Sequence, residues 1–245
     1  MMGRFLRDIA VDTAVNGFDA RSYPFNLPVV RGLISGGRLE IGPGVTFIAG
    51  DNGSGKSTLI EAIAVAAGFN PEGGSRNFRF TTKATESPLG RYLTVGRVAG
   101  RRERSNFFFR AESFYNVVTE IESLGVEAGY GGRSLHERSH GESFLDLIEN
   151  RFHPGGLYLL DEPEAALSPR GLLIALARLH ALTQAGSQLL IATHSPILLA
   201  LPGATIMQIS DDGQLRRVAY DEADAVRVTR DFLAAPERTL RHLLD

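Results

Sequence analysis

The sequence predicts an α/β fold in which a mostly parallel sheet is flanked by helices. Three short apolar runs, at residues 45–49, 157–160 and 188–192, are typical of strands that are buried on both faces of a sheet. Segments with helical spacing lie between these runs, and strands that alternate with helices favour parallel pairing.

The composition limits the class of protein. The chain has 245 residues, a net charge of −2 and no cysteine. Its length suits one large domain or two small ones. The lack of cysteine excludes disulfide scaffolds, cysteine zinc sites and thiol catalysis. The apolar stretches are too short or interrupted to span a bilayer, and the first residues reach an acid too early for a signal peptide. We therefore expect a cytoplasmic protein without membrane insertion.

The first half of the chain contains four further predicted elements. Residues 38–41 alternate between polar and apolar, as in a half-buried strand. Apolar residues within 56–67 have helical spacing, which predicts a helix soon after the first apolar strand. Residues 91–98 and 106–110 are predicted as two strands, joined as a hairpin by residues 100–105.

The second half of the chain adds helices and a hairpin. Strands at 205–210 and 214–220 flank the turn sequence Asp-Asp-Gly at 211–213, which predicts a hairpin. Pro169 suits the first turn of a helix. Helices are predicted at residues 141–151, 169–184 and 236–244.

A glycine-rich loop follows the first apolar strand. It fits the pattern G-x-x-x-x-G-K-[ST], in which glycines let backbone N–H groups turn inward around phosphates beside a helix N-terminus. Lys56 is expected to reach the β- and γ-phosphates of ATP, and the Ser57 hydroxyl to bind Mg²⁺. The predicted nucleotide-binding residues are Gly50, Asp51, Asn52, Gly53, Ser54, Gly55, Lys56, Ser57 and Thr58.

Two acids follow the apolar run at 157–160. Asp161 suits the coordination shell of Mg²⁺, and Glu162 suits a general base that activates the attacking water. If this strand neighbours the strand before the phosphate loop, both acids lie beside the loop, because parallel strands end at one edge.

Two more motifs stand at the ends of predicted elements. Residues 139–143, Ser-His-Gly-Glu-Ser, begin a helix, where a hydroxyl and free N–H groups can face a phosphate. A plain helix cap is the alternative interpretation. His194 follows the strand at 188–192 and is a candidate contact for a γ-phosphate or the attacking water, with a structural histidine as the alternative.

These four elements, in this order, resemble the ATP-binding cassette (ABC) superfamily over about residues 45–200. The resemblance implies a P-loop ATPase fold with an N-terminal antiparallel β layer and a small helical signature subdomain. It implies one domain over residues 1–245, with a core at about 38–220, a helical insertion at 70–150 and a C-terminal hairpin and helices at 204–245. It assigns the phosphate loop, the signature motif, the Walker B acids and the switch histidine to residues 50–57, 139–143, 161–162 and 194.

In that superfamily two subunits pair head to tail around ATP. The resemblance implies an ATP-dependent homodimer in which Ser139, Gly141 and Glu142 of one copy bind the nucleotide that the other copy holds. It implies catalytic roles for Lys56, Glu162 and His194, with hydrolysis switching the dimer and so moving an unidentified protein partner. The sequence is most similar to soluble, non-transporter members called predicted AAA-family ATPases, which are akin to SMC- and RecF-type heads without coiled-coil arms.

The chain departs from the cassette pattern at three points. It has no glutamine before Gln184, so the Q-loop glutamine is missing, and Glu112 is the predicted replacement as a metal contact. Ser168 stands where the D-loop aspartate is usual. Tyr23 or Phe25 is a candidate for stacking on adenine.

Three other functions remain open from the sequence. The chain could be the nucleotide-binding subunit of an ABC transporter. It could be an ATP-sensing nucleic-acid clamp, because residues 76–110 hold nine basic residues against two acids, with Arg101, Arg102 and Arg104 at the tip of the predicted hairpin. A solvated hairpin is the plainer interpretation of that charge. Residues 136–140 also fit the H-E-x-x-H pattern of zinc hydrolases.

Overall fold

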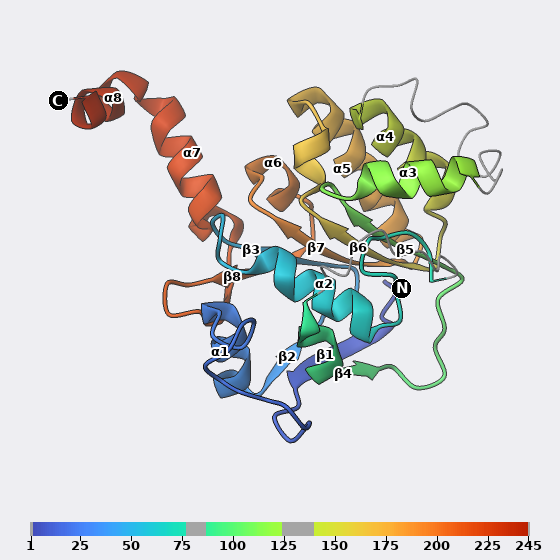
Figure 1. The fold of residues 1–245 in the computed structure, drawn as a ribbon. Helices are drawn as coiled ribbons and strands as arrows, with labels where there is room; N and C mark the ends of the chain where they lie inside the picture. Colours follow the sequence, from blue (N-terminus) through green and yellow to red (C-terminus); the bar gives the residue numbers. More distant parts are fainter. Residues whose placement is uncertain (1, 77–86, 124–139, 245) are drawn as a thin grey trace.

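A six-stranded sheet forms the centre of the computed structural model, which describes residues 2–76, 87–123 and 140–244 (Figure 1). Five neighbouring strands run parallel, and the strand at one edge is antiparallel to its neighbour. The α/β fold with a mostly parallel sheet is therefore confirmed. The spatial order is β5 (Ser105–Arg110), β6 (Gly156–Asp161), β7 (Gln188–Thr193), β3 (Val45–Ala49), β8 (Thr205–Ile209) and β9 (Leu215–Val218).

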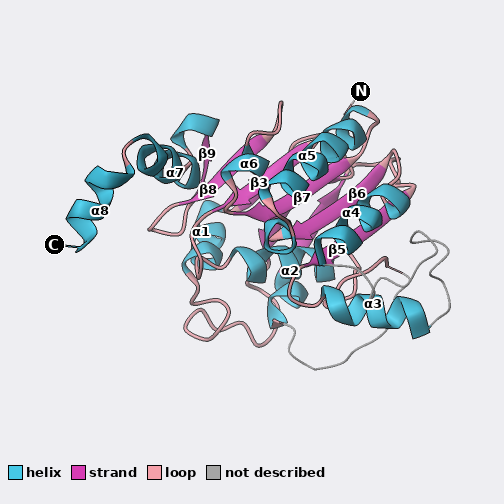
Figure 2. Ribbon diagram, turned by 90° about the horizontal axis from the view of Figure 1, so that it is seen from above, coloured by secondary structure: helices cyan, strands magenta, loops and turns pink. Residues whose placement is uncertain are grey.

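Helices cover both faces of this sheet (Figure 2). In β6, Tyr158 and Leu160 pack into the core on one face, whereas Leu157 and Leu159 pack into the core on the other. This explains why the apolar runs are continuous, because a strand covered on both faces has no side that faces water. The first face is covered by α3 (Phe114–Ser123), α4 (His140–Arg151), α5 (Pro169–Gln184) and α6 (Pro196–Leu199). The second is covered by α1 (Pro28–Gly36) and α2 (Lys56–Ala66).

A three-stranded antiparallel sheet lies beyond α2, as the resemblance to cassettes implies. It comprises β2 (Arg38–Glu40), β1 (Leu6–Val11) and β4 (Leu93–Arg97), in that order. The predicted hairpin across residues 100–105 is wrong, because β4 pairs with β1 whereas β5 pairs with β6 in the other sheet. Residues 98–104 therefore form a connection between two sheets.

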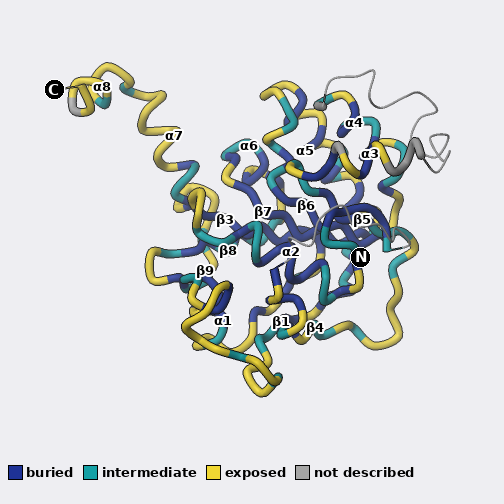
Figure 3. The backbone as a smooth tube through the Cα atoms, in the orientation of Figure 1, coloured by how far each residue is buried: buried dark blue, intermediate teal, exposed yellow. Residues whose placement is uncertain are grey.

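The C-terminal part of the chain extends away from the body. The hairpin of β8 and β9 is confirmed. Helix α7 (Asp224–Ala234), whose bounds were not predicted, leads into the predicted amphipathic helix α8 (Pro236–Leu244), and most of both helices is exposed (Figure 3). No helix within the described residues has the length and apolar character that crossing a membrane requires.

Candidate functional site

The site lies where β3, β6 and β7 end, at the carboxyl edge of the parallel sheet. The sequence left open whether β6 is a neighbour of β3. It is not, because β7 lies between them. Asp161 at the end of β6, Glu162 after it and His194 after β7 nevertheless converge on the loop after β3, because all three strands point the same way.

The glycine-rich loop turns directly into α2. Gly53 and Gly55 both have positive φ, and Gly55 stands immediately before the first helical residue, Lys56. A Cβ on Gly55 would lie 2.7 Å from a side-chain carbon of Val29, so the position requires glycine on both counts. The Lys56 side chain is only 3% exposed and its Nζ donates a hydrogen bond of 2.8 Å to the Asp51 carbonyl. The ammonium group is thus held inside the loop.

Ser57 and Asp161 meet at the start of α2. The Ser57 hydroxyl donates a hydrogen bond to the Asp161 carboxylate, which is 7% exposed. Burial raises the pKa of Asp161 to about 6 from an ordinary value of 3.8, although that hydrogen bond and the Arg110 charge oppose the rise. One oxygen, Asp161 Oδ1, is buried without a hydrogen-bond partner among the described residues.

This pair of oxygen ligands fits Mg²⁺. The described residues contain no group of three histidine, cysteine, aspartate or glutamate side chains that could hold a metal by themselves. An ion at Ser57 and Asp161 would therefore need further oxygen ligands from water and substrate phosphates, which is how Mg²⁺ is usually bound.

Glu162 carries the strained backbone of the site. Its φ of 48° and ψ of 54° are left-handed, and no other non-glycine residue that the structure describes has a positive φ. This conformation costs about 1 kcal/mol or more and is found mostly at functional positions. Glu162 Oε1 lies 3.7 Å from Lys56 Nζ and 3.7 Å from His194 Nδ1, so the predicted catalytic residues are brought together.

Sequence reasoning missed Glu164, whose side chain is 7% exposed. Its Oε1 accepts hydrogen bonds from the Thr193 hydroxyl at 2.6 Å and from the His194 N–H at 2.8 Å, and it lies 3.3 Å from His194 Nδ1. One carboxylate oxygen therefore fixes both the backbone and the ring of His194. The only signal was a third acid, one proline after the predicted pair.

Comparison with known proteins divides the chain into two matching parts. Residues 29–123, which contain the glycine-rich loop, match a family model described as "AAA domain". Residues 144–200, which contain both acids and His194, match a model described as "AAA domain, putative AbiEii toxin, Type IV TA system". Residues 29–123 and 144–200 thus match P-loop ATPase domains of the AAA/ABC type.

The similar curated proteins are larger than this chain. Macrolide export ATP-binding/permease protein MacB of Campylobacter jejuni is 23% identical over 218 residues, which are 79% of this chain and 32% of that protein. MacB of Hahella chejuensis is 30% identical over 203 residues, which are 71% of this chain and 29% of that protein. The chain thus spans about a third of the length of these relatives.

Two similar solved structures extend over most of the chain. One is a nucleotide-free ATP-binding cassette from an ABC transporter, 18% identical, with a TM-score of 0.48 and 96% of each chain covered. The other is the SMC head domain from Thermotoga maritima, 18% identical, with a TM-score of 0.42, covering 87% of this chain and 98% of that one.

The remaining predicted site residues lie in different surroundings. Glu112 is 86% exposed and its carboxylate lies 3.4 Å from Arg110, so its contact with a metal stays a prediction. Ser139 of the signature-like motif lies outside the described residues. The same holds for the first four residues, 136–139, of the H-E-x-x-H pattern. Gly141 lies in the first turn of α4, where a Cβ would lie 2.8 Å from the Ala166 carbonyl oxygen, and Glu142 follows it.

The structure also describes the residues predicted to stack on adenine and those predicted to contact nucleic acid. Phe25 is buried against Phe18 and Tyr92, whereas Tyr23 is 59% exposed, so only Tyr23 presents a ring at the surface. Arg101, Arg102 and Arg104 line a surface pocket of about 460 Å³ where β5, β6 and β7 begin, at the sheet edge opposite the nucleotide loop. A nucleic-acid contact there stays a prediction.

Proposed function

We propose that this ATPase binds Mg-ATP at residues 50–58 and Asp161, and that Glu162 and His194 act on the γ-phosphate. The observation that carries the proposal is the approach of Glu162 Oε1 to both Lys56 Nζ and His194 Nδ1, each at 3.7 Å. A base, a phosphate-binding cation and an imidazole so arranged suit the hydrolysis of a nucleotide.

Each side chain has a role that follows from its position. The Lys56 ammonium exchanges the Asp51 carbonyl for the oxygens of the β- and γ-phosphates. Glu162 takes a proton from the water that attacks the γ-phosphorus, while the bond from that phosphorus to the ADP oxygen breaks. His194 orients the γ-phosphate and the water. Mg²⁺ at Ser57 and Asp161, when bound, supplies positive charge beside the phosphates.

The proposal includes a head-to-tail dimer. The N-terminus of α4, with Ser139, Gly141 and Glu142, would close on the nucleotide of a second copy, where a helix N-terminus stabilises negative charge. Closure on ATP and opening after hydrolysis would switch an unidentified partner. The cytoplasmic location belongs to the same proposal.

Light scattering tests the dimer. Glu162→Gln keeps the size of the side chain but removes the base, so it should retain ATP, and its mass should double with Mg-ATP. Ser139→Arg in that background should abolish the doubling. Thr229→Arg in the same background adds the same side chain on the exposed helix α7, and the mass should still double with Mg-ATP. A mass that ATP does not change, despite tight ATP binding, would contradict the dimer.

The curated relatives favour a second candidate function. They are ATP-binding/permease proteins, which suggests that the chain supplies ATP hydrolysis to a membrane partner. Fractionation of native cells separates the candidates. Sedimentation of the chain with salt-washed membranes would favour a transporter role, and recovery in the supernatant would favour the free dimer.

A further inference from the structure

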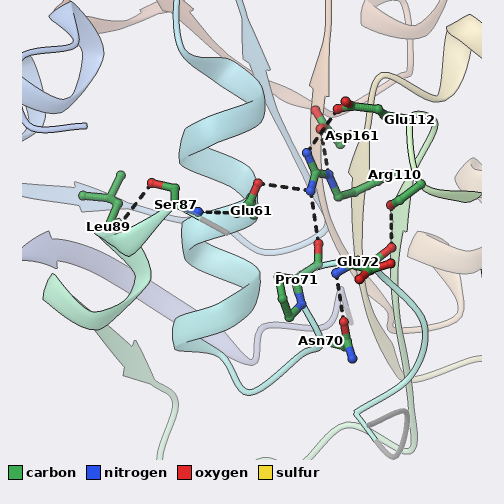
Figure 4. A network of polar contacts seen from close by, with 10 residues as sticks. Glu61, Asn70, Pro71, Glu72, Ser87, Leu89, Arg110, Glu112 and Asp161 are labelled. Atoms are coloured by element: carbon green, nitrogen blue, oxygen red, sulfur yellow. Dashed lines mark hydrogen bonds and ion pairs between the residues drawn. The ribbon is translucent and has the colours of Figure 1, made fainter. Parts of the chain in front are cut away.

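Arg110 occupies the end of β5, directly opposite Asp161 in the pairing with β6. Its side chain is 16% exposed and reaches between two buried carboxylates, Asp161 on β6 and Glu61 on α2 (Figure 4). A guanidinium beside a candidate metal ligand is an unexpected neighbour, because it competes with a metal cation for the same oxygens.

The contacts of Arg110 with these two carboxylates are unequal, and its Nη2 also lies 3.4 Å from the exposed carboxylate of Glu112. Arg110 Nη1 lies 3.1 Å from Glu61 Oε2 and donates to the Pro71 carbonyl at 3.2 Å. In contrast, Arg110 Nε lies 3.7 Å from Asp161 Oδ2, beyond hydrogen-bond distance. Arg110 Nε and Asp161 Oδ1 are both buried without a hydrogen-bond partner among the described residues. The guanidinium is therefore drawn toward Glu61, and Asp161 is left largely uncommitted.

Glu61 is itself held in place. Its Oε1 accepts a hydrogen bond of 2.9 Å from the Ser87 backbone N–H, while Oε2 faces Arg110. Glu61 also follows Ser57 by four residues on α2, which places the two side chains one turn apart on the same face of the helix. One helix thus carries a metal ligand and the carboxylate that holds the competing cation.

We propose that Glu61 is a positioning residue that keeps Arg110 away from Asp161, so that Asp161 remains available to the metal of Mg-ATP. The inference rests on the proposed binding of Mg-ATP. Without Glu61, the partly buried guanidinium would close on Asp161 with charge-assisted hydrogen bonds, and Mg²⁺ would have to break them. Arg110 in turn neutralises part of the acidic charge around the site while no metal is bound.

A double-mutant cycle tests this arrangement by binding rather than by turnover. The measurement is the Mg²⁺ concentration that gives half-maximal binding of a fluorescent, non-hydrolysable ATP analogue. Glu61→Gln should raise that concentration about tenfold or more, the usual effect of losing an outer-shell partner. Arg110→Gln alone should not raise it. The double variant should return to within about threefold of the unmutated chain, because nothing then competes for Asp161.

Two further variants exclude a general loss of structure. Glu103→Gln removes another buried carboxylate that pairs with arginines, Arg76 and Arg97, before the start of β5, and it should leave the Mg²⁺ dependence unchanged. If Glu61→Gln does not fold, Ser87→Pro leaves the Glu61 carboxylate in the chain and removes one of its anchors. Ser87 has a φ of −66°, which proline adopts, and proline has no N–H to donate to Glu61; it also lacks the hydroxyl that accepts the Leu89 N–H. This variant should shift the Mg²⁺ dependence in the same direction.

The outcomes separate the two proposals. An unchanged Mg²⁺ dependence in Glu61→Gln, or a double variant as impaired as Glu61→Gln, would overturn the positioning role while Mg-ATP binding stood. If the unmutated chain did not bind the analogue with Mg²⁺, the proposed function would fail and the inference with it.

Discussion

Glu164 holds His194 through a single carboxylate oxygen, which accepts the His194 N–H at 2.8 Å and lies 3.3 Å from its Nδ1. A carboxylate at this distance favours the tautomer with the proton on Nδ1 and leaves Nε2 free for a substrate. The same oxygen accepts the Thr193 hydroxyl, so the end of β7 and the turn after β6 are tied together. The backbone and ring of His194 are therefore held in place by another residue of the same chain.

Substitution of Glu164 should lower turnover more than nucleotide affinity. In Glu164→Ala the ring of His194 loses its anchor, so we expect kcat to fall about a hundredfold with KM changed only a few-fold. Glu164→Gln retains an oxygen that can accept both N–H and O–H, and should lose less activity. Steady-state kinetics give the split between kcat and KM, and NMR of the His194 nitrogens reports the tautomer. An equal loss in both variants, with the tautomer unchanged, would count against positioning.

The sequence predicted those parts of the fold that depend on local patterns. Helix α5 begins at Pro169 and ends at Gln184 as expected, because Ser168 caps its first turn through the Gly171 N–H and Gly186 follows its end with a positive φ. Strand β3 agrees with its apolar run, residue for residue. These signals lie within or next to the element, so no knowledge of its neighbours was needed.

Pairing between distant segments was not predictable from the same signals. Strand β4 lies close in sequence to β5, which favoured a hairpin, yet it pairs with β1 more than 80 residues earlier. Strand β1 itself has an Arg-Asp pair in its middle, and Asp8 is buried between Arg7 and Arg38. An acid within a strand argues against burial unless a partner for it is known. The partner of Asp8, Arg38, comes from β2, so the sequence pattern of β1 alone did not indicate a strand.

The site was predicted where its residues follow a motif. Lys56, Asp161, Glu162 and His194 meet as expected, since each stands at the end of a parallel strand or soon after one. Glu61 and Arg110 were not predicted, because nothing in the sequence indicates that one turn of α2 faces the last residue of β5.

Relief of the strain at Glu162 should stabilise the protein and abolish its activity. Glu162→Gly removes the cost of a left-handed backbone, which we expect to raise the free energy of unfolding by about 1 kcal/mol. The same change removes the proposed base, so ATP hydrolysis should be lost. Glu162→Gln keeps the strained backbone and should lose activity without the gain in stability. Urea unfolding measures both variants, and a glycine variant no more stable than the glutamine variant would contradict the assignment of strain.

Asp161 should make the metal-free protein less stable as the pH rises. Because burial raises its pKa from 3.8 to about 6, the folded chain binds this proton more tightly than the unfolded chain does. Stability from this group is therefore present below about pH 4 and is lost as the pH rises through 6. A rise of about two pKa units corresponds to about 3 kcal/mol.

Asp161→Asn isolates this contribution. In the presence of EDTA the variant should be more stable than the unmutated chain at pH 8, by up to about 3 kcal/mol, and the difference should vanish near pH 4. Urea unfolding across this pH range measures the difference directly. A difference that grew toward low pH would mean that the carboxylate is stabilised in the folded chain.

Gly55 and Gly53 should respond differently to alanine, although both have a positive φ. Gly53→Ala meets no atom within 4 Å, so it should cost only the conformational penalty of about 1 kcal/mol. Gly55→Ala carries the same penalty and also brings a Cβ to 2.7 Å from Val29, which α1 holds in the core. We expect a loss of about 2 kcal/mol or more in unfolding free energy, together with displacement of the start of α2. Because Lys56 and Ser57 begin that helix, ATP affinity should fall further in Gly55→Ala than in Gly53→Ala. Equal losses of stability in the two variants would show that Val29 yields to the new methyl group.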